Sequence, residues 1–155
     1  MSGANVHPRG QNGADIVDDV GTQLAGSSQR FTATRRAIVS VLADADGPLS
    51  IPEIMEATDD LAQSSVYRNL AVLEQAGVVT RVSGVDDRVR YELGEHLTGH
   101  HHHLVCTSCG AVADVRIPDA LEQDLERVLT RLAGSAGFAM EHHRLDLIGR
   151  CAACR

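Results

Sequence analysis

The chain of 155 residues carries 14 basic and 21 acidic side chains, a formal net charge of −7, and 43% hydrophobic residues. That length fits one or two small domains with an apolar core. The net charge argues against nucleic-acid binding through overall charge, although not against a local basic patch. No apolar run reaches the length of a membrane span, and the N-terminus lacks an apolar signal core. We therefore expect a cytoplasmic protein with no membrane partner, whose paired cysteines are metal ligands rather than disulfides.

The first half of the chain predicts a winged helix-turn-helix. Apolar spacing predicts a helix over residues 14–25, within an N-terminal extension of residues 1–26 whose role is open. Further helices are expected after Thr32, after Ser50, and from Ser64 or Ser65 to Gly77. The runs "VVTRVSG" and "DRVRYELG" then predict a two-stranded hairpin. Three helices followed by a hairpin define a winged-helix domain over residues 27–94.

The remaining residues, 95–155, predict a second, smaller domain. "HHHHLVCTSCGAVADVRI" is typical of two strands joined by a Cys-x-x-Cys turn. Residues 119–134 predict a helix with leucines along one side, and "FAMEHHRLDLIGRC" alternates like a strand. The expected fold class is thus α+β, a winged helix-turn-helix followed by a small α/β domain.

A local basic patch lies in the winged-helix region. Residues 27–43 contain no acid, and they carry Arg30, Arg35 and Arg36. The expected recognition helix begins "QSSVYR", which offers hydroxyl, phenol and guanidinium groups to a DNA major groove. A serine pair at a helix start is also an ordinary cap, and an exposed arginine is ordinarily solvated.

The four cysteines form two Cys-x-x-Cys pairs, Cys106 with Cys109 and Cys151 with Cys154. Each turn holds two thiolates on one side, and two such turns make the closed tetrahedral cage that Zn²⁺ favours. A closed cage is structural because no position stays open for a substrate. Redox disulfides and an iron site are the alternatives.

Four consecutive histidines, residues 100–103, precede the first cysteine pair. In an extended chain successive side chains point to opposite faces, so His100 and His102 face one way and His101 and His103 the other. The run therefore predicts two metal sites, each completed from elsewhere by candidates that include Glu92, Glu95, His96, Asp114, Glu122, His142 and His143. A solvated histidine-rich hinge with adventitious metal affinity is the alternative.

These motifs together resemble the ferric uptake regulator family of bacterial metal-responsive repressors. "SSVYRNLAVLEQAGVV", the wing ending "RYEL", the histidine run with "CTSC" and the terminal "CAAC" occur in the family's order over residues 27–155. The resemblance implies a homodimer, in which the winged helix binds double-stranded DNA at a palindromic operator and the second domain dimerises.

The resemblance also assigns roles to single residues. It implies that Tyr67 contacts a base, Arg68 the backbone or a base edge, and Arg30 the adjacent minor groove. The DNA surface is expected to comprise Arg30, Arg35, Ser64, Ser65, Tyr67 and Arg68. Cys106, Cys109, Cys151 and Cys154 match a structural zinc site; His100, His102, Glu122 and His143 match a second site; His101 and His103 match two ligands of a regulatory site at the hinge.

The regulatory site departs from the family pattern. Gly47 or Pro48 stands where iron-type members place a histidine, and Thr80 stands where zinc-type members place an aspartate. Counted back from Cys106, His96 falls at the place of the zinc-type cysteine. The expected ligand set is therefore Glu92, His96, His101 and His103, with Asp114 as the alternative carboxylate. Such a set suits Zn²⁺, Fe²⁺ or Mn²⁺.

The sequence thus predicts a repressor whose hinge metal sets the orientation of the two winged helices in a dimer. A peroxide- or redox-responsive regulator using the same metal site is one alternative. A metal-storage or scaffold protein without DNA binding is another. An enzyme is not expected, because the chain lacks the His-Glu-x-x-His and His-x-Glu…Pro-Cys-x-x-Cys motifs of zinc hydrolases and deaminases.

Overall fold

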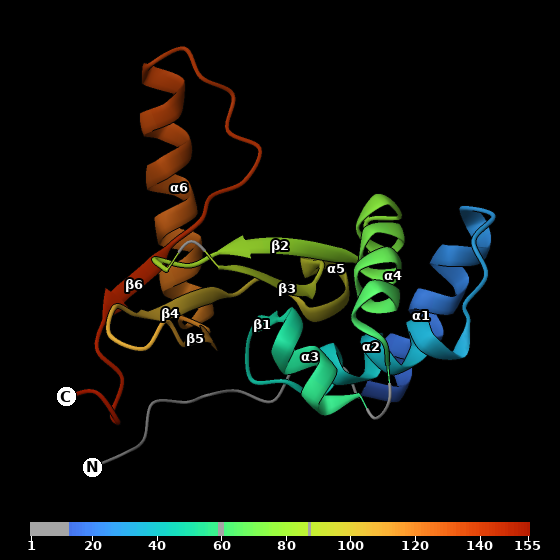
Figure 1. Ribbon diagram of the computed structural model, residues 1–155. Helices are drawn as coiled ribbons and strands as arrows, with labels where there is room; N and C mark the ends of the chain where they lie inside the picture. The colour runs from blue at the N-terminus through green and yellow to red at the C-terminus, as the bar shows by residue number, and fades with distance from the viewer. Residues whose placement is uncertain (1–12, 59–60, 87) are drawn as a thin grey trace.

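The computed structural model describes residues 13–58, 61–86 and 88–155. The chain forms helices and two separate three-stranded sheets, which confirms the predicted α+β class (Figure 1). Residues 1–12 of the expected N-terminal extension lie outside the described ranges. Within those ranges, no helix combines the length and the apolar character needed to cross a bilayer.

The N-terminal half has the order of a winged helix-turn-helix. Strand β3 lies between β1 and β2 and is antiparallel to both. The elements are α1 (Gly13–Gly26), α2 (Ala33–Asp44), β1 (Leu49–Ser50), α3 (Ile51–Ala57), α4 (Gln63–Gln75), β2 (Val79–Ser83) and β3 (Val89–Leu93). Strand β1 was not predicted, because two residues are too few to show an alternating pattern.

Helix α1 belongs to the core of this half. Ile16, Val20 and Leu24 recur along one of its faces and are completely buried. They pack in one cluster with α2, α4, the wing strands and Leu97. Residues 13–26 of the extension therefore pack on the winged helix. The expected domain boundaries near residues 26 and 94 remain predictions.

The starts of α2 and α3 follow local capping rules, and the start of α4 does not. The Thr32 side chain accepts a hydrogen bond from the Arg35 N–H, and Ser50 forms a capping box with Glu53. The prediction that Ser64 or Ser65 caps α4 is wrong. Ala62, in an extended conformation, is the N-cap, and both serines lie inside the first helical turn. Their hydroxyls therefore do not cap the helix.

The C-terminal half is built around strand β4. Its neighbours are β5, antiparallel, and β6, parallel. The elements are α5 (Glu95–Thr98), β4 (His102–Cys106), β5 (Val112–Val115), α6 (Asp119–Ser135) and β6 (Asp146–Gly149). The predicted strand over 138–151 is mostly wrong, because only Asp146–Gly149 pair with β4. The residues before β6 run beside α6, where His143 contacts Glu126.

Helix α6 extends away from the rest of the molecule (Figure 1). None of its residues is buried, although its leucines and Val128 follow a helical stripe. Val128 is 59% exposed and Leu132 is 65% exposed. Leu147 and Ile148 of β6 are exposed as well. A single chain thus leaves much of the apolar surface of its second half uncovered.

Candidate metal centres and DNA interface

The histidine run divides between two groups of side chains, by parity. His101 and His103 meet Glu92 and Asp114, and we call these four residues the hinge group. His100 and His102 meet Glu122 and His143, which we call the α6 group. Within each group the potential ligand atoms all lie within 4.8 Å of one another. This division agrees with the alternation expected of an extended chain.

The hinge group joins the two halves of the molecule. Glu92 comes from β3, and its Oε2 atom accepts hydrogen bonds from His101 Nε2 at 3.2 Å and His103 Nε2 at 3.0 Å. Asp114 of β5 lies opposite His103 in the strand register, with its Oδ1 atom 4.0 Å from His103 Nε2 and 3.9 Å from His101 Nε2. All four residues are buried or half-buried.

His96 lies outside the hinge group, which corrects the expected ligand set. It belongs to the short helix α5, and its Nε2 atom donates a hydrogen bond to Gln23 Oε1 of α1 at 2.9 Å. Counting back from Cys106 assumed an extended chain, whereas the chain between Gly94 and Gly99 coils into a helical turn. The alternative carboxylate, Asp114, takes the place expected for His96.

Proximity shifts the protonation of the hinge group. Burial alone would raise the pKa of Glu92, but hydrogen bonds from His101 and His103 lower it to about 2. The hydrogen bond to Glu92 raises the pKa of His101 to about 9, against the effect of burial. Burial opposes protonation of His103, yet the contact with Glu92 raises its pKa. Without a cation, the positive charge of the protonated imidazoles offsets the negative charge of the Glu92 carboxylate.

Outer contacts orient both imidazoles of the hinge group. His101 Nδ1 donates to the carbonyl oxygen of Gly99 at 3.0 Å, and His103 Nδ1 lies 3.4 Å from Asp146 Oδ1. Asp146 is in turn held by Arg144, at 2.9 Å. These contacts at Nδ1 leave Nε2 of each ring directed at Glu92, which is the arrangement found around metal-binding histidines.

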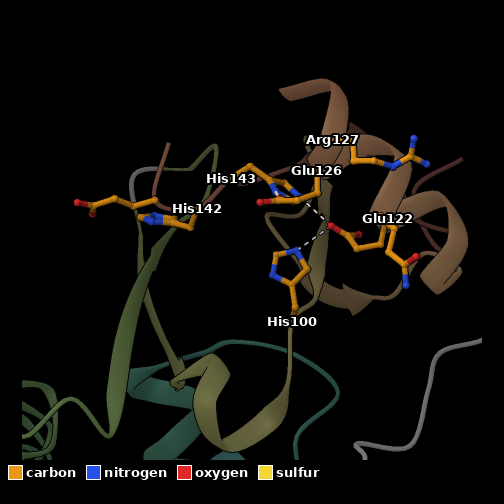
Figure 2. Close-up of a pocket in the computed structure, with 8 residues that line it drawn as sticks. His100, Glu122, Glu126, Arg127, His142 and His143 are labelled. Carbon is orange, nitrogen blue, oxygen red and sulfur yellow. Dashed lines mark hydrogen bonds and ion pairs between the residues drawn. The ribbon is translucent and has the colours of Figure 1, made fainter. Parts of the chain in front are cut away.

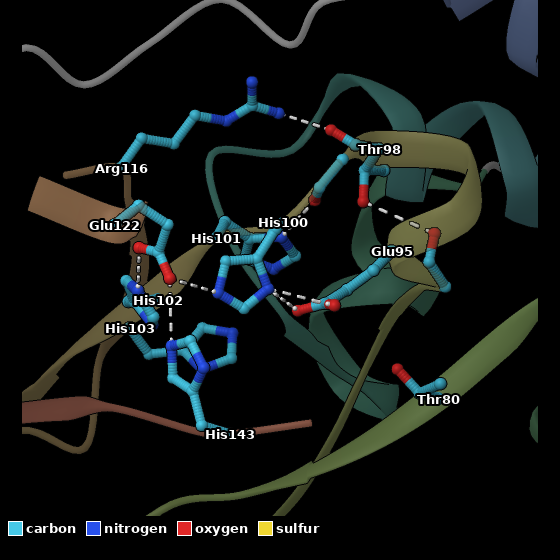
Figure 3. Close-up of polar contacts among 12 residues, drawn as sticks. Thr80, Glu95, Thr98, His100, His101, His102, His103, Arg116, Glu122 and His143 are labelled. Carbon is cyan, nitrogen blue, oxygen red and sulfur yellow. Dashed lines mark hydrogen bonds and ion pairs between the residues drawn. The ribbon is translucent and has the colours of Figure 1, made fainter. Parts of the chain in front are cut away.

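The α6 group is centred on the Glu122 carboxylate (Figures 2 and 3). His102 Nε2 lies 2.9 Å from Glu122 Oε2, and the Nε2 atoms of His100 and His143 lie 3.2 and 3.0 Å from Oε1. Glu122 Oε1 and His143 Nε2 are buried without a hydrogen bond of good geometry. Buried polar atoms in that condition fit coordination by a cation. A pocket of about 580 Å³ opens beside the group.

The four cysteines converge and form no disulfide. Cys109 Sγ and Cys151 Sγ are 3.8 Å apart, close to the sulfur separation of about 3.8 Å that four Zn–S bonds of about 2.3 Å give in a tetrahedron. Backbone N–H groups, first that of Cys151 at 3.3 Å, lower the pKa of Cys106 to about 6. The cysteine group therefore fits a structural zinc ion.

Helix α4 presents the expected DNA-contacting side chains. Tyr67 is 53% exposed, and Arg68 is exposed with its Nε atom donating to the Ser64 carbonyl oxygen at 3.2 Å. Ser64 and Arg30 are exposed and Ser65 is half-buried.

Arg35 has a different environment from the other expected DNA contacts. Its Nε atom donates to Asn69 Oδ1 at 3.1 Å, and its Nη1 atom contacts the Arg30 carbonyl oxygen. Arg35 thus ties α2 to α4 and to the preceding segment, and much of its hydrogen-bonding capacity is used inside the protein.

Sequence reasoning missed two arginines of the wing. Arg81 and Arg88 line a groove of about 760 Å³ together with Tyr67, between α3, α4 and the wing strands. Their side chains are 53% and 73% exposed. The alternation of the predicted hairpin contained a signal for Arg81, which it places on the same face as Tyr91. Arg88 precedes β3, so alternation gave no such signal for it.

The comparisons with known proteins agree with this geometry. The profile of the ferric uptake regulator family matches residues 26–148. The ferric uptake regulation protein of Bacillus subtilis strain 168 is 33% identical over 144 residues, which cover 89% of this chain and 93% of that protein. The peroxide operon regulator of the same strain is 29% identical over 135 residues, 84% of this chain and 88% of that protein.

A solved structure supports the fold independently. The ferric uptake regulator of Helicobacter pylori, described as having three functional metal-binding sites, superimposes with a TM-score of 0.75 at 22% identity. The match covers 96% of this chain and 97% of that one. Together with the family profile and the Bacillus relative, it establishes that this chain belongs to the ferric uptake regulator family of metal-responsive transcriptional regulators.

Proposed function

We propose that the protein is a metal-responsive transcriptional repressor that binds double-stranded DNA as a homodimer. The hinge group carries this proposal, because its side chains come from both halves of the chain. Glu92 belongs to a wing strand, whereas His103 and Asp114 belong to the second sheet. A ligand set that spans the junction makes the orientation of the winged helix depend on what the set holds.

The donor chemistry supports a divalent cation at the hinge. Two imidazoles and two carboxylates suit Zn²⁺, Fe²⁺ or Mn²⁺, and the absence of a thiolate from the group leaves these three open. With the cation bound, the four side chains hold β3 against β4 and β5. In a dimer this fixes the separation and tilt of the two α4 helices, and so their fit to the half-sites of a palindromic operator.

The exposed face of α4 and the wing supports DNA as the partner. Tyr67 projects from α4, and Arg81 and Arg88 lie on the wing beside it. Arg30 adds an exposed charge in a stretch without acids. We assign base contacts to Tyr67 and Arg68 and phosphate contacts to the remaining arginines, with Ser64 and Ser65 as further hydroxyl donors.

The uncovered apolar surface of the second half supports a homodimer. Val128 and Leu132 of α6 and Ile148 of β6 are mostly exposed in one chain. Exposed apolar residues gathered on a helix and a neighbouring strand mark an interaction surface. We propose that a second copy covers them, which places two winged helices in one assembly.

We propose that the protein is not an enzyme and that it acts in the cytoplasm. Each of the three groups offers four protein donors, so a tetrahedral cation has no position left for a substrate. The cysteine group would hold a structural Zn²⁺, and the α6 group a second cation through His100, His102, Glu122 and His143.

A peroxide-responsive regulator is the second candidate function. The similarity to the peroxide operon regulator of Bacillus subtilis favours it, as does a hinge group made only of nitrogen and oxygen donors. Addition of hydrogen peroxide to the Fe²⁺-loaded protein on DNA separates the candidates. Loss of DNA binding that fresh Fe²⁺ does not restore supports a peroxide response, and unchanged binding supports metal sensing alone.

The main proposal is tested by metal titration of DNA binding. DNA duplexes are first selected from a random pool with metal-loaded protein, and the protein is then stripped at the hinge by a chelator that spares the cysteine group. Restored binding on addition of Zn²⁺, Fe²⁺ or Mn²⁺ at buffered free concentrations is the expected result. If no DNA sequence is enriched, a metal-storage protein is favoured. If DNA binding does not change with any of the three cations, metal responsiveness is refuted.

A further inference from the structure

The loop between α2 and β1 rests against strand β5, main chain to main chain. A Cβ atom on Gly47 would lie 2.7 Å from the Val112 carbonyl oxygen and 2.9 Å from Ala113 Cα. Contacts below 3.0 Å are essentially absent for real Cβ atoms. Both neighbours are backbone atoms of a paired strand, so no side-chain rotation can make room. Only glycine allows this approach.

The same loop makes a hydrogen bond to β5 at a residue of the hinge group. The Asp114 N–H donates to the Asp46 carbonyl oxygen at 3.0 Å. Strand β5 is an edge of its sheet, and the Asp114 N–H points to that open edge rather than to β4. The loop therefore covers an edge that would otherwise face solvent, and Gly47 itself is buried.

The loop is also tied to the other carboxylate of the hinge group. It leads directly into β1, where Leu49 pairs with Tyr91 of β3, the residue before Glu92. The winged helix thus reaches the hinge group twice. It supplies Glu92 through a side chain, and it holds the strand of Asp114 through the backbone of Asp46 and Gly47.

We propose that Gly47 is a positioning residue for the hinge metal site. By admitting the close approach of the α2–β1 loop, it keeps β5 where the Asp114 carboxylate meets Glu92, His101 and His103. This inference rests on the proposed function, since it takes the hinge group to bind a cation. It adds a second connection between the metal site and the winged helix, which runs from Asp114 through the backbone of β5 to the α2–β1 loop.

The variant Gly47→Ala tests this inference, with Gly26→Ala as the matched control. A Cβ at Gly26, the last residue of α1, would meet nothing within 4 Å. Co²⁺ is the probe ion, titrated against a competing chelator. We expect Gly47→Ala to weaken Co²⁺ binding at the hinge group by about tenfold or more while the α6 group keeps its affinity, because changes in residues that orient metal ligands cost about 10–100-fold in affinity. A purely structural role would instead shift the unfolding temperature and leave the affinity of the folded hinge group unchanged.

A double-mutant cycle with Asp114→Ala shows whether the loop acts through that carboxylate. If it does, Gly47→Ala costs little further Co²⁺ affinity once Asp114 is gone, because coupled residues are not additive. Wild-type Co²⁺ affinity in the folded Gly47→Ala protein would overturn the inference, as would full additivity.

Amide exchange keeps the inference testable if Gly47→Ala does not fold. In the metal-free wild-type protein, the Asp114 N–H should exchange slowly although it lies on a sheet edge, and exchange at the rate of an unprotected amide would refute the contact. The proposed function fails separately. The proposed function is refuted if DNA binding by the wild-type protein does not change with any divalent cation. The Co²⁺ affinities of the variants would still test the role of Gly47 in that case.

Discussion

Glu92 Oε2 lies 3.0 Å from His103 Nε2, and this contact links the last wing strand to the first strand of the second sheet. The same oxygen accepts from His101 at 3.2 Å, so one carboxylate of the winged helix gathers both odd-numbered histidines. We propose that metal binding at the hinge depends on this carboxylate, which lies outside both the histidine run and the cysteine pairs.

Replacing Glu92 with glutamine should separate the hinge group from the other two groups. The amide keeps the size of the side chain but removes its charge, so we expect metal affinity at the hinge to fall by about tenfold to a hundredfold and metal-dependent DNA binding to fall with it. Isothermal titration with DNA-binding assays measures both. The exposed Glu56 on α3 gives the matched control, Glu56→Gln, which should behave as wild type. An unchanged hinge affinity in Glu92→Gln would remove this residue from the site.

Metal affinity at the hinge should rise with pH. The pKa of His101 is raised to about 9 and that of His103 is raised, so a cation must displace their protons. The apparent affinity is expected to increase up to about tenfold per pH unit for each proton displaced, and to level off near pH 9. Chelator competition at a series of pH values checks the slope. A flat profile from pH 6 to pH 9 would contradict the assigned protonation.

The metal-free protein should show the opposite pH trend in stability. A histidine pKa raised above 6.5 adds stability that is complete below pH 6.5 and is lost as pH rises through about 9. The Glu92 pKa, lowered from 4.5 to about 2, adds stability above pH 4.5 that is lost as pH falls through about 2. The contribution of this group is therefore largest between pH 4.5 and 6.5. Thermal unfolding of the chelated protein tests this, with Glu92→Gln expected to flatten the profile.

Loss of one cysteine should destabilise the second half of the chain. Cys109→Ser leaves three thiolates for the zinc ion, and none of the four cysteines belongs to the winged-helix core. We expect the bound zinc to become removable by a weak chelator and the C-terminal half to unfold at a temperature lower by about 10 °C or more. Ala152→Ser, an exposed position in the terminal Cys-x-x-Cys, is the control and should keep its zinc. Zinc release followed with a chromogenic chelator measures both.

Tyr67→Ala should weaken DNA binding without loss of stability. The ring is 53% exposed, so its removal uncovers little core. A lost base contact costs about 1–3 kcal/mol, which lowers the affinity roughly 5- to 150-fold. Fluorescence anisotropy with the selected duplex gives the affinity, and Tyr67→Phe separates the ring from the hydroxyl. If Tyr67→Ala binds DNA with wild-type affinity, the assignment of the DNA-binding surface to α4 is wrong.

The sequence predicts the ligand types better than their partners. The alternation of an extended chain separates His100 and His102 from His101 and His103, and the cysteine spacing brings four thiols together, because both patterns are local. Asp114 lies opposite His103 because of the register between β4 and β5, which the cysteine turn sets. That register cannot be predicted from the sequence without first pairing the two strands.

Other contacts could not be predicted because they join distant segments. His96 binds Gln23 because α5 coils the chain and α1 packs beside it. The approach of Gly47 to β5 depends on how two sheets meet, for which a single glycine carries no recognisable pattern. The winged-helix elements were predicted from periodicity and capping, except for the two-residue strand β1. The four-residue helix α5 after the wing was not predicted either.

Helix α6 has no buried residue, although Val128 and its leucines form a continuous stripe. Val128→Asp should therefore give a monomer by sedimentation, whereas Thr130→Asp on the opposite side should leave the wild-type mass. The exposed stripe also makes the lifetime of the protein depend on its concentration. At low copy number the second half of each chain spends more time uncovered and open to proteases, so a falling rate of synthesis shortens the lifetime of the regulator as well as lowering its amount.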